Sequence, residues 1–219
     1  MSLDVKICGI SRPDAMAAAV TAGARFIGLN FYPPSPRAVT PQVAAQLARL
    51  APTGVRAVGL FVDADDETLN EVVAHVPLDM LQLHGSETPE RVAAVADRFA
   101  MPVMKAIRVA EAADLAAAAP YEAVADWLLF DAKPPANVRA LPGGNGIPFD
   151  WSLLAGRTWS RPWMLSGGLT ADNLAEAVAA TGAAVVDVSS GVEDRPGHKP
   201  PERVRAFLEA AHQLPAVTS

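Results

Sequence analysis

Two residues near the start of the chain, Lys6 and Cys8, have side chains that could carry out acid–base or nucleophilic chemistry. They lie in the short apolar run 5–10, and Cys8 is the only cysteine in 219 residues. If the run is a strand, residues two apart face the same side, so the thiol lies beside an ammonium group. A neighbouring cation favours the reactive thiolate. The pattern therefore indicates either a reactive thiol or a small buried hydrophobic residue, since free cysteine is often buried.

Asp131 is a second candidate for acid–base chemistry, because it ends the apolar run 127–130. A carboxyl group in that position is partly removed from water, which raises its pKa and suits it to act as a general acid. The alternative is a surface aspartate that begins a loop or pairs with Lys133. The local sequence leaves both interpretations open.

Two glycine- and serine-rich turns are typical of phosphate-binding loops. Glycine lets backbone N–H groups approach an anion closely, and serine adds hydroxyl donors. Both turns follow an expected strand, and we expect them to hold a phosphate group. Their candidate residues are Gly167, Gly168, Ser189, Ser190 and Gly191.

Arg37 and Asp187 are candidates for further contacts with a ligand. Arg37 follows the proline-rich segment 33–36, which stiffens the chain, and guanidinium pairs well with a carboxylate or phosphate. The alternative for Arg37 is a solvated loop side chain. Asp187 shares a strand face with Ser189, so it is expected to reach a sugar hydroxyl or to pair with a lysine.

Short β-rich runs alternate with alanine-rich helical stretches along the whole chain. The expected strands are 5–9, 26–31, 57–62, 80–83, 103–107, 127–131, 163–165 and 185–188. The expected helices are 13–22, 41–50, 67–75, 89–99, 110–119, 149–154, 171–180 and 201–212. Threonine followed by proline, as at Thr40 and Thr88, is a helix-start signal. Short apolar strands between helices predict a parallel sheet that helices cover.

Eight such units predict an α/β fold, a closed (β/α)8 TIM barrel that forms one domain over residues 1–219. An open doubly wound sheet is the competing fold, but no G-x-G-x-x-G fingerprint follows the first expected strand. Active sites of (β/α)8 barrels lie at the C-terminal ends of the strands, where all the candidates above fall. We interpret the Pro- and Gly-rich segment 133–148 as an active-site loop.

Composition excludes several other classes of function. The net charge of −6 and the lack of a basic block argue against a nucleic-acid partner and an anionic membrane surface. No apolar run is long enough to span a bilayer, and the start of the chain does not resemble a secretory signal. A lone cysteine without such a signal indicates a cytoplasmic protein. Four scattered histidines do not have the spacing of a metal site.

Nine short motifs, each at an expected strand end or loop, together resemble the phosphoribosylanthranilate isomerase family of tryptophan biosynthesis. They are KICGI at 6–10, GLNF at 28–31, SPR at 35–37, GLFV at 59–62, LQLHG at 81–85, FDAK at 130–133, GGNG at 143–146 with FDW at 149–151, SGGL at 166–169 and VDVSSGVE at 186–193.

The resemblance implies a monofunctional isomerase of the aldose–ketose type that uses neither a metal nor a cofactor. Its substrate would be N-(5-phosphoribosyl)anthranilate, and an Amadori rearrangement would give the 1-deoxyribulose 5-phosphate isomer. By the same resemblance, Cys8 is the general base, Asp131 is the general acid, and Arg37 binds the anthranilate carboxylate. The two glycine- and serine-rich turns would surround the phosphate, and Asp187 would contact a sugar hydroxyl. The enzyme is expected to be a monomer or a homodimer.

Two other functions compete with this one. A Schiff-base aldolase would use Lys105 or Lys133 as its nucleophile. A non-catalytic barrel that binds a phosphorylated ligand would lack an acid or a base, and this chain offers both. Relatives that also isomerise a histidine-pathway intermediate use paired aspartates at symmetric strand ends, and Cys8 at the first of these positions argues against that activity.

Overall fold

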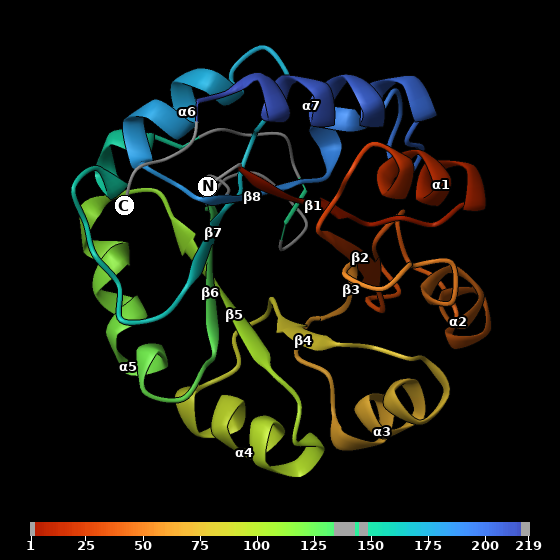
Figure 1. The fold of residues 1–219 in the computed structure, drawn as a ribbon. Helices are drawn as coiled ribbons and strands as arrows, with labels where there is room; N and C mark the ends of the chain where they lie inside the picture. The colour runs from red at the N-terminus through yellow and green to blue at the C-terminus, as the bar shows by residue number, and fades with distance from the viewer. Residues whose placement is uncertain (1–2, 134–142, 145–148, 216–219) are drawn as a thin grey trace.

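Eight parallel strands form a closed barrel in which each strand pairs with the next and β8 pairs with β1. The structure, a computed structural model, describes residues 3–133, 143–144 and 149–215. Figure 1 shows the helices as a ring around the strands. The predicted (β/α)8 barrel is therefore confirmed.

The strands lie where the apolar runs predicted them, within about two residues at each end. Their bounds are β1 Asp4–Cys8, β2 Phe26–Asn30, β3 Arg56–Phe61, β4 Met80–Leu83, β5 Val103–Val109, β6 Trp127–Ala132, β7 Trp163–Leu165 and β8 Val185–Val188. The α-helices are α1 Pro13–Thr21, α2 Pro41–Ala48, α3 Asp66–His75, α4 Pro89–Phe99, α5 Ala119–Glu122, α6 Leu174–Thr181 and α7 Pro201–Gln213. The described residues also form the 3-10 helices η1 Ala112–Ala118, η2 Trp151–Leu154 and η3 Ser190–Val192.

The expected threonine caps form at the start of two helices. The hydroxyl of Thr40 accepts a hydrogen bond from the backbone N–H of Val43, and Thr88 does the same for Arg91. Proline occupies the next position in each helix, where no backbone donor is needed. Local sequence signals thus fix where α2 and α4 begin.

Three expected helices differ from those in the structure. The helix expected over 149–154 is the short 3-10 helix η2, Trp151–Leu154. Residues 110–119 were expected to form one α-helix, but they form mainly η1, whose capping box between Glu111 and Asp114 closes a tighter turn. The helix expected over 171–180 is α6, which begins at Leu174 after a turn over 171–173. Thr170 and Asn173, at the two ends of this turn, each accept a side-chain hydrogen bond from the other's backbone N–H. These two bonds form the reciprocal pattern of a capping box, which stabilises the start of a helix.

Hydrophobic side chains fill the barrel below the active site. Seven strands contribute to this buried cluster, which is separate from the larger core between strands and helices. Its members are Phe26, Val58, Met80, Met104, Ala106, Leu129, Met164 and Val185. Because side chains alternate along a strand, the next inward positions on β4, β6 and β8 are Gln82, Asp131 and Asp187. The apolar cluster is therefore the floor of a polar layer.

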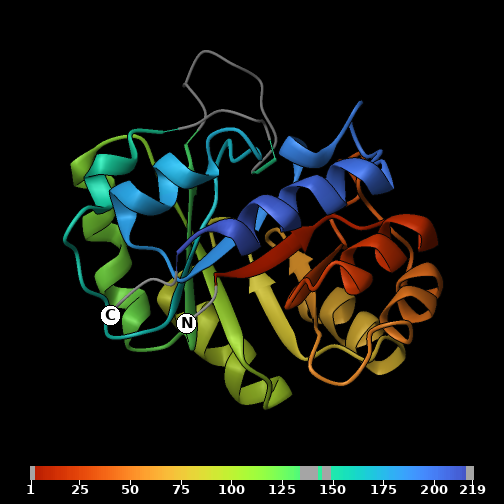
Figure 2. The same cartoon turned by 45° about the horizontal axis from the view of Figure 1, so that its top comes forward.

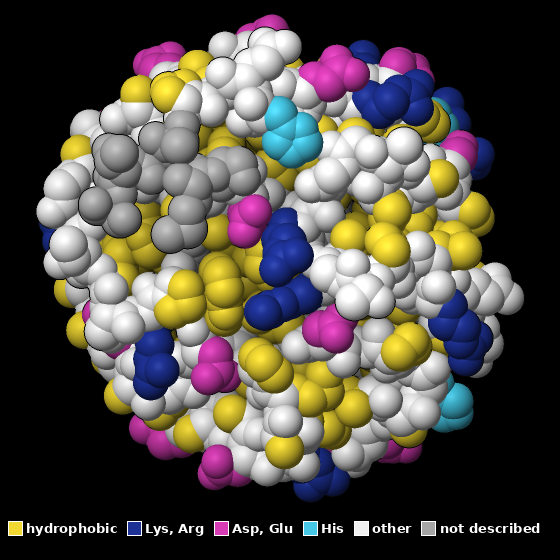
Figure 3. Space-filling model, viewed as in Figure 1, with side chains coloured by type: hydrophobic (Ala, Val, Ile, Leu, Met, Phe, Trp, Pro, Cys, Tyr) yellow, Lys and Arg dark blue, Asp and Glu magenta, His cyan; other side chains and the backbone are white. Residues whose placement is uncertain are grey.

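The last helix closes the ring against the first. Figures 1 and 2 both show α7 lying alongside α1, and the two helices are in contact. On the face that Figure 3 shows, basic and acidic side chains are interspersed and do not form a patch of one sign. No helix within the described residues is long and apolar enough to cross a membrane.

Candidate active site

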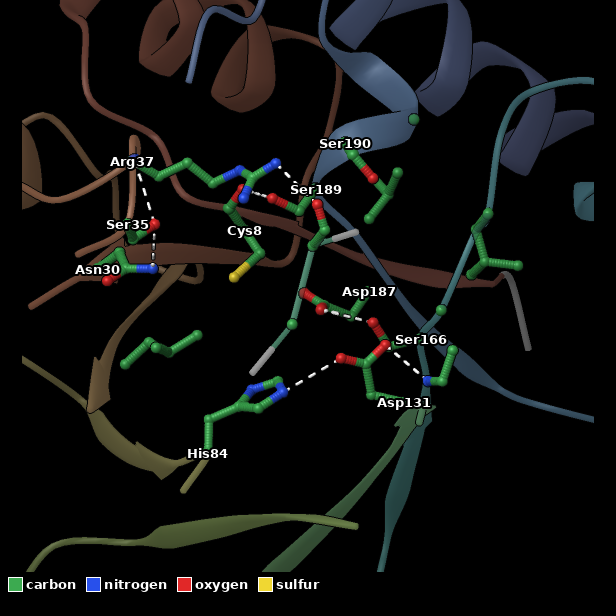
Figure 4. A pocket seen from close by; sticks show the side chains of 18 of the residues that line it. Cys8, Asn30, Ser35, Arg37, His84, Asp131, Ser166, Asp187, Ser189 and Ser190 are labelled. Atoms are coloured by element: carbon green, nitrogen blue, oxygen red, sulfur yellow. Dashed lines mark hydrogen bonds and ion pairs between the residues drawn. The ribbon is translucent and has the colours of Figure 1, made fainter. Parts of the chain in front are cut away.

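A cavity lies at the C-terminal ends of the strands and brings the predicted site residues together. Its lining includes every one of them: Cys8, Arg37, Asp131, Gly167, Gly168, Asp187, Ser189, Ser190 and Gly191. In Figure 4 the sulfur of Cys8 and the carboxyl group of Asp131 point into the same space from β1 and β6. Of the predicted loop 133–148, Gly143 and Gly144 line the cavity, and most of the rest lies outside the described residues.

Cys8 is the last residue of β1 and is buried, with a relative exposure of 5%. Gly28 on β2 leaves room for it, since a Cβ there would lie 3.0 Å from the sulfur. Burial raises the pKa of the Cys8 thiol, and Asp187 raises it further. Lys6 and Lys199 lower this pKa, but they do not offset the burial. Lys6 thus favours the thiolate as predicted, while the pKa as a whole lies above its usual value.

Lys6 lies beneath Cys8 in a buried ion pair. Its Nζ lies 2.8 Å from Oδ1 of Asp187, whose Oδ2 accepts a hydrogen bond of 3.1 Å from the hydroxyl of Ser166. Burial opposes the charge on Lys6, but Asp187 and Cys8 outweigh it and hold the pKa of the ammonium above its usual value. Of the two roles expected for Asp187, pairing with a lysine is the one present here.

Arg37 is buried, with a relative exposure of 5%, so the alternative of a solvated loop arginine is wrong. Its Nε and Nη2 lie 2.7 and 2.8 Å from the two carboxylate oxygens of Glu193, and Nη2 also donates to the carbonyl of Gly144. Lys199 approaches Glu193 to 2.6 Å. Burial works against the charge on Glu193, but Arg37 and Lys199 hold its pKa below the usual value.

Sequence reasoning did not identify Glu193 and Lys199 as site residues. Both lie within or near the motif that follows β8, but nothing in the local pattern shows that they meet Arg37 from the loop after β2. Burial of Lys199 lowers its pKa despite the attraction of Glu193. A cluster of two cations and one anion therefore borders the cavity next to Cys8.

Asp131 lies in β6 and is buried, with a relative exposure of 4%. Its Oδ1 accepts a hydrogen bond of 2.9 Å from the N–H of Ala132, and its Oδ2 lies 3.1 Å from Nε2 of His84. The alternative partner, Lys133, instead pairs with Asp114 at 2.6 Å. The interpretation of Asp131 as a surface aspartate or as the partner of Lys133 is therefore wrong.

The two turns after β7 and β8 require glycine at specific positions. Gly167 and Gly168 have φ values of +90° and +66°, which glycine adopts without strain. A side chain at Gly191 would collide with the carbonyl of Leu169 in the other turn. The two turns therefore pack closely against each other at the rim of the cavity.

The two serines of the second turn differ in the hydrogen bonds that their hydroxyls make. The hydroxyl of Ser189 donates to the carbonyl of Cys8 and accepts from Lys199. Within the described residues, the hydroxyl of Ser190 makes no hydrogen bond to a backbone carbonyl or to a lysine. Ser190 lines the cavity. The expected hydroxyl donor to phosphate is thus available at Ser190 and already engaged at Ser189.

The two lysines that a Schiff-base aldolase would need do not line the cavity. Lys105 is buried and bonds to Glu87 at 2.7 Å and to two backbone carbonyls, of Leu83 and Gly85. Lys133 is held at the surface by Asp114. Neither amine is free to attack a carbonyl in the cavity, which argues against the aldolase.

Fold and site together define a (β/α)8-barrel enzyme whose cavity presents a thiol, a carboxyl group and an arginine. The chain belongs to the N-(5′-phosphoribosyl)anthranilate isomerase family, whose model matches residues 5–210. The isomerase of Rhodospirillum centenum is 67% identical over 98% of this chain and 100% of that protein. The isomerase of Paramagnetospirillum magneticum is 60% identical over 96% of this chain and 98% of that protein.

Solved structures of the same family share the fold. The phosphoribosyl anthranilate isomerase of Thermotoga maritima superposes with a TM-score of 0.86 at 35% identity, over 97% of this chain and 100% of that one. A second structure holds reduced 1-(o-carboxyphenylamino)-1-deoxyribulose 5-phosphate, with a TM-score of 0.82 at 33% identity over the same shares of the chains. The predicted family and the predicted isomerase class are confirmed.

Proposed function

We propose that the chain isomerises N-(5′-phosphoribosyl)anthranilate by an Amadori rearrangement in which Asp131 is the general acid and Cys8 is the general base. The observation that carries the assignment is the placement of both side chains, from β6 and β1, in one buried cavity that the two glycine- and serine-rich turns border. A proton can thus be given at one side of a bound sugar and taken at the other.

In the first step Asp131 protonates the ring oxygen of the ribose. The bond between that oxygen and the anomeric carbon breaks, and the nitrogen of the substrate supplies the electron pair that forms the Schiff base. The negative charge then remains on the carboxylate. This step needs a carboxyl group that starts with its proton, and Asp131 has the N–H of Ala132 and the ring of His84 as its partners, with no lysine or arginine paired to it among the described residues.

In the second step the thiolate of Cys8 removes the proton from C2′, and an enolamine forms. Its tautomerisation gives the ketone. Because burial raises the pKa of Cys8, the thiolate depends on the two nearby ammonium groups, Lys6 and Lys199. Cys8 acts here as a base and forms no covalent bond with the sugar.

Three groups bind the substrate away from the reacting carbons. Nη1 of Arg37 is the part of the guanidinium that Glu193 does not engage, and we assign it to the carboxylate of the anthranilate. Backbone N–H groups at Gly167, Gly168, Ser189 and Gly191, with the hydroxyl of Ser190, bind the phosphate. Asp187, fixed by Lys6 and Ser166, contacts a sugar hydroxyl.

The test measures the loss of anthranilate fluorescence when the purified chain meets freshly made phosphoribosylanthranilate. We expect Cys8→Ala and Asp131→Asn each to lower kcat by about 10²- to 10⁴-fold, the range for one general acid or base. Circular dichroism and thermal unfolding serve as controls that the barrel remains folded. Near-normal turnover in either folded variant would refute the role given to that residue.

The proposal extends to the setting of the enzyme. We expect it to act in the cytoplasm on a small phosphorylated molecule, as a monomer or a homodimer, and without nucleic acid as a partner. The net charge of −6 favours the last point. Sedimentation of the purified chain distinguishes the two assembly states.

A further inference from the structure

Gln82 and His84 form a buried chain of hydrogen bonds that ends on the carboxyl group of Asp131. Nε2 of Gln82 lies 2.8 Å from Nδ1 of His84, and Nε2 of His84 lies 3.1 Å from Oδ2 of Asp131. Gln82 is fully buried, and the other two side chains are each 4% exposed. Polar groups so far from water must satisfy one another, so the direction of each bond is constrained.

The amide of Gln82 determines which ring nitrogen of His84 carries the proton. As it lies, the amide N–H donates to Nδ1, which must then be unprotonated, and Oε1 of Gln82 lacks a hydrogen-bond partner within the described residues. Rotating the amide would give Oε1 a partner but would leave two N–H donors without an acceptor. Orphaned N–H groups are rarer than under-used carbonyls. His84 therefore carries its proton on Nε2, and that N–H faces Asp131.

We propose that His84 is a positioning residue for the general acid, because its Nε2–H stabilises the negative charge left on Asp131 when the acid gives up its proton. Gln82 fixes the tautomer that makes this bond possible. The inference rests on the proposed function, in which Asp131 protonates the ring oxygen of the substrate.

The charge forms only as the proton leaves. The O–H bond of Asp131 breaks, an O–H bond forms on the sugar, and the electron pair stays on the carboxylate. Oδ1 already faces the N–H of Ala132 at 2.9 Å, and Oδ2 faces Nε2 of His84. A donor held in place before the charge develops lowers the barrier without reorganisation.

The bond between His84 and Asp131 is buried and lies close to Gly143. A Cβ on Gly143 would lie 2.8 Å from Oδ2 of Asp131 and 2.8 Å from Nε2 of His84. A side chain at position 143 would therefore press on both atoms of the bond, so glycine is needed here. A hydrogen bond to a developing charge is stronger in such a buried place than in water.

The backbone of His84 is also fixed, so the ring cannot withdraw from Asp131. Its N–H donates to the carbonyl of Phe61, and its carbonyl accepts from Arg108 at 3.0 Å. The next turn is held by Glu87, which accepts from Gly85 and pairs with Lys105. These contacts place the imidazole within reach of the acid before substrate binds.

The first test compares His84→Ala with His84→Gln. We expect His84→Ala to lower kcat by about 10²-fold, as for the loss of one preorganised donor, with a much smaller change in KM. The amide of His84→Gln offers an N–H near the former Nε2 and should restore most of kcat. His75→Ala, at an exposed position of α3, is the matched control and should leave kcat unchanged. Equal loss of kcat in both His84 variants would overturn the inference.

The second test separates this inference from the proposed function. If His84 acts through Asp131, adding His84→Ala to Asp131→Asn should lower kcat no further. An unchanged kcat in Asp131→Asn alone would refute the proposed function. A loss of kcat in Asp131→Asn, with none in His84→Ala, would refute the inference alone.

The third test follows the pH profile of kcat. Without the donor, the carboxyl group of Asp131 holds its proton more tightly, so the limb at which activity falls with rising pH should move to higher pH in His84→Ala. The charged and titratable groups around the acid are Cys8, Arg37 and Asp187 in the cavity and Arg108 behind His84, and all are retained. An unmoved limb would indicate a merely structural role.

The tautomer itself can be observed by nitrogen NMR of a chain labelled in its four histidines. The signal that disappears in His84→Gln should show a protonated Nε2 and a bare Nδ1. In Gln82→Met, which keeps the length of the side chain without its amide, that preference should weaken and kcat should fall. A proton on Nδ1 in the original chain would overturn the inference.

Discussion

The two sides of the cavity are built from different groups. On the base side, Cys8 is surrounded by full charges, with Lys6 paired to Asp187 and Lys199 paired to Glu193. On the acid side, Asp131 contacts the N–H of Ala132 and the ring of His84, and no lysine or arginine within the described residues pairs with it. Both sides are buried, so the difference lies in charge and not in exposure.

This difference matches what each group must do. A buried thiol stays protonated unless cations stabilise the thiolate, and burial does raise the pKa of Cys8 here. A carboxyl group that must begin with its proton is served better by neutral partners than by a lysine or arginine. Acid–base enzymes commonly use different environments to shift the pKa values of the acid and the base in opposite directions.

Removing the cation beneath the base should have the largest effect on activity among the changes considered below. Lys6→Met takes away a charge that lowers the pKa of Cys8, so the limb at which kcat/KM rises with pH should move to higher pH. At a fixed pH below that limb, activity should fall in proportion to the fraction of Cys8 present as thiolate. The same change leaves Asp187 buried and unpaired, which should destabilise the fold by about 3–5 kcal/mol. The pH profile of kcat/KM and urea unfolding measure the two effects.

The double variant Lys6→Met with Asp187→Asn separates charge from stability. It removes both partners of the ion pair, so much of the stability should return. Because Asp187 itself raises the pKa of Cys8, the limb should lie between those of the original chain and Lys6→Met. A limb that stays in place in both variants would mean that Lys6 does not tune the base.

Arg37→Ala should have the next largest effect and should act on binding. Loss of a charged hydrogen bond to the substrate carboxylate costs about 1.5–3 kcal/mol, which corresponds to a KM raised by roughly 10- to 100-fold. Since Arg37 touches neither reacting carbon in the proposed arrangement, kcat should change much less. Steady-state kinetics give both constants, and an unchanged KM would refute the carboxylate contact.

The sequence predicted the parts of the site that depend on strand order. Alternation of apolar runs and helices indicated the barrel, and the barrel rule then placed Cys8, Asp131 and the two turns at one end. Composition and short-range spacing suffice for this, because strand ends and turns are local features. The inward direction of Lys6 also follows from the alternation of side chains along a strand.

The contacts between loops could not be predicted in this way. Arg37 meets Glu193 although 156 positions separate them, and His84 meets Asp131 across 47. No local pattern distinguishes these partners from other charged or polar residues at strand ends. The rise in the pKa of Cys8 is also a tertiary effect, because burial outweighs the neighbouring lysine that the sequence does show.

Gly143→Ala should disturb the acid side while leaving the base side intact. The new Cβ would press on Asp131 and His84 at 2.8 Å from each, and relief of such overpacking typically costs about 1–3 kcal/mol. If half of that cost raises the barrier of the step that Asp131 catalyses, kcat should drop by roughly 2- to 10-fold. The rising limb of the pH profile, which reports Cys8, should stay in place. A displacement of that limb would show that the two sides are not independent.

Glu193→Gln should have the smallest effect on activity and should sharpen the base side of the comparison. The amide can still accept from Arg37 through its oxygen, but it cannot bond both Nε and Nη2 as acceptors, so Arg37 should become less well placed. We expect KM to rise a few-fold, consistent with about 0.5–1.5 kcal/mol for one hydrogen bond. Without the carboxylate, the positive charge of Lys199 is no longer neutralised and should favour the thiolate of Cys8 more strongly. The rising limb of the kcat/KM profile should therefore move to lower pH, whereas in Lys6→Met it should move to higher pH. A limb that moves in the same direction in both variants would contradict the conclusion that fixed charges set the pKa of Cys8.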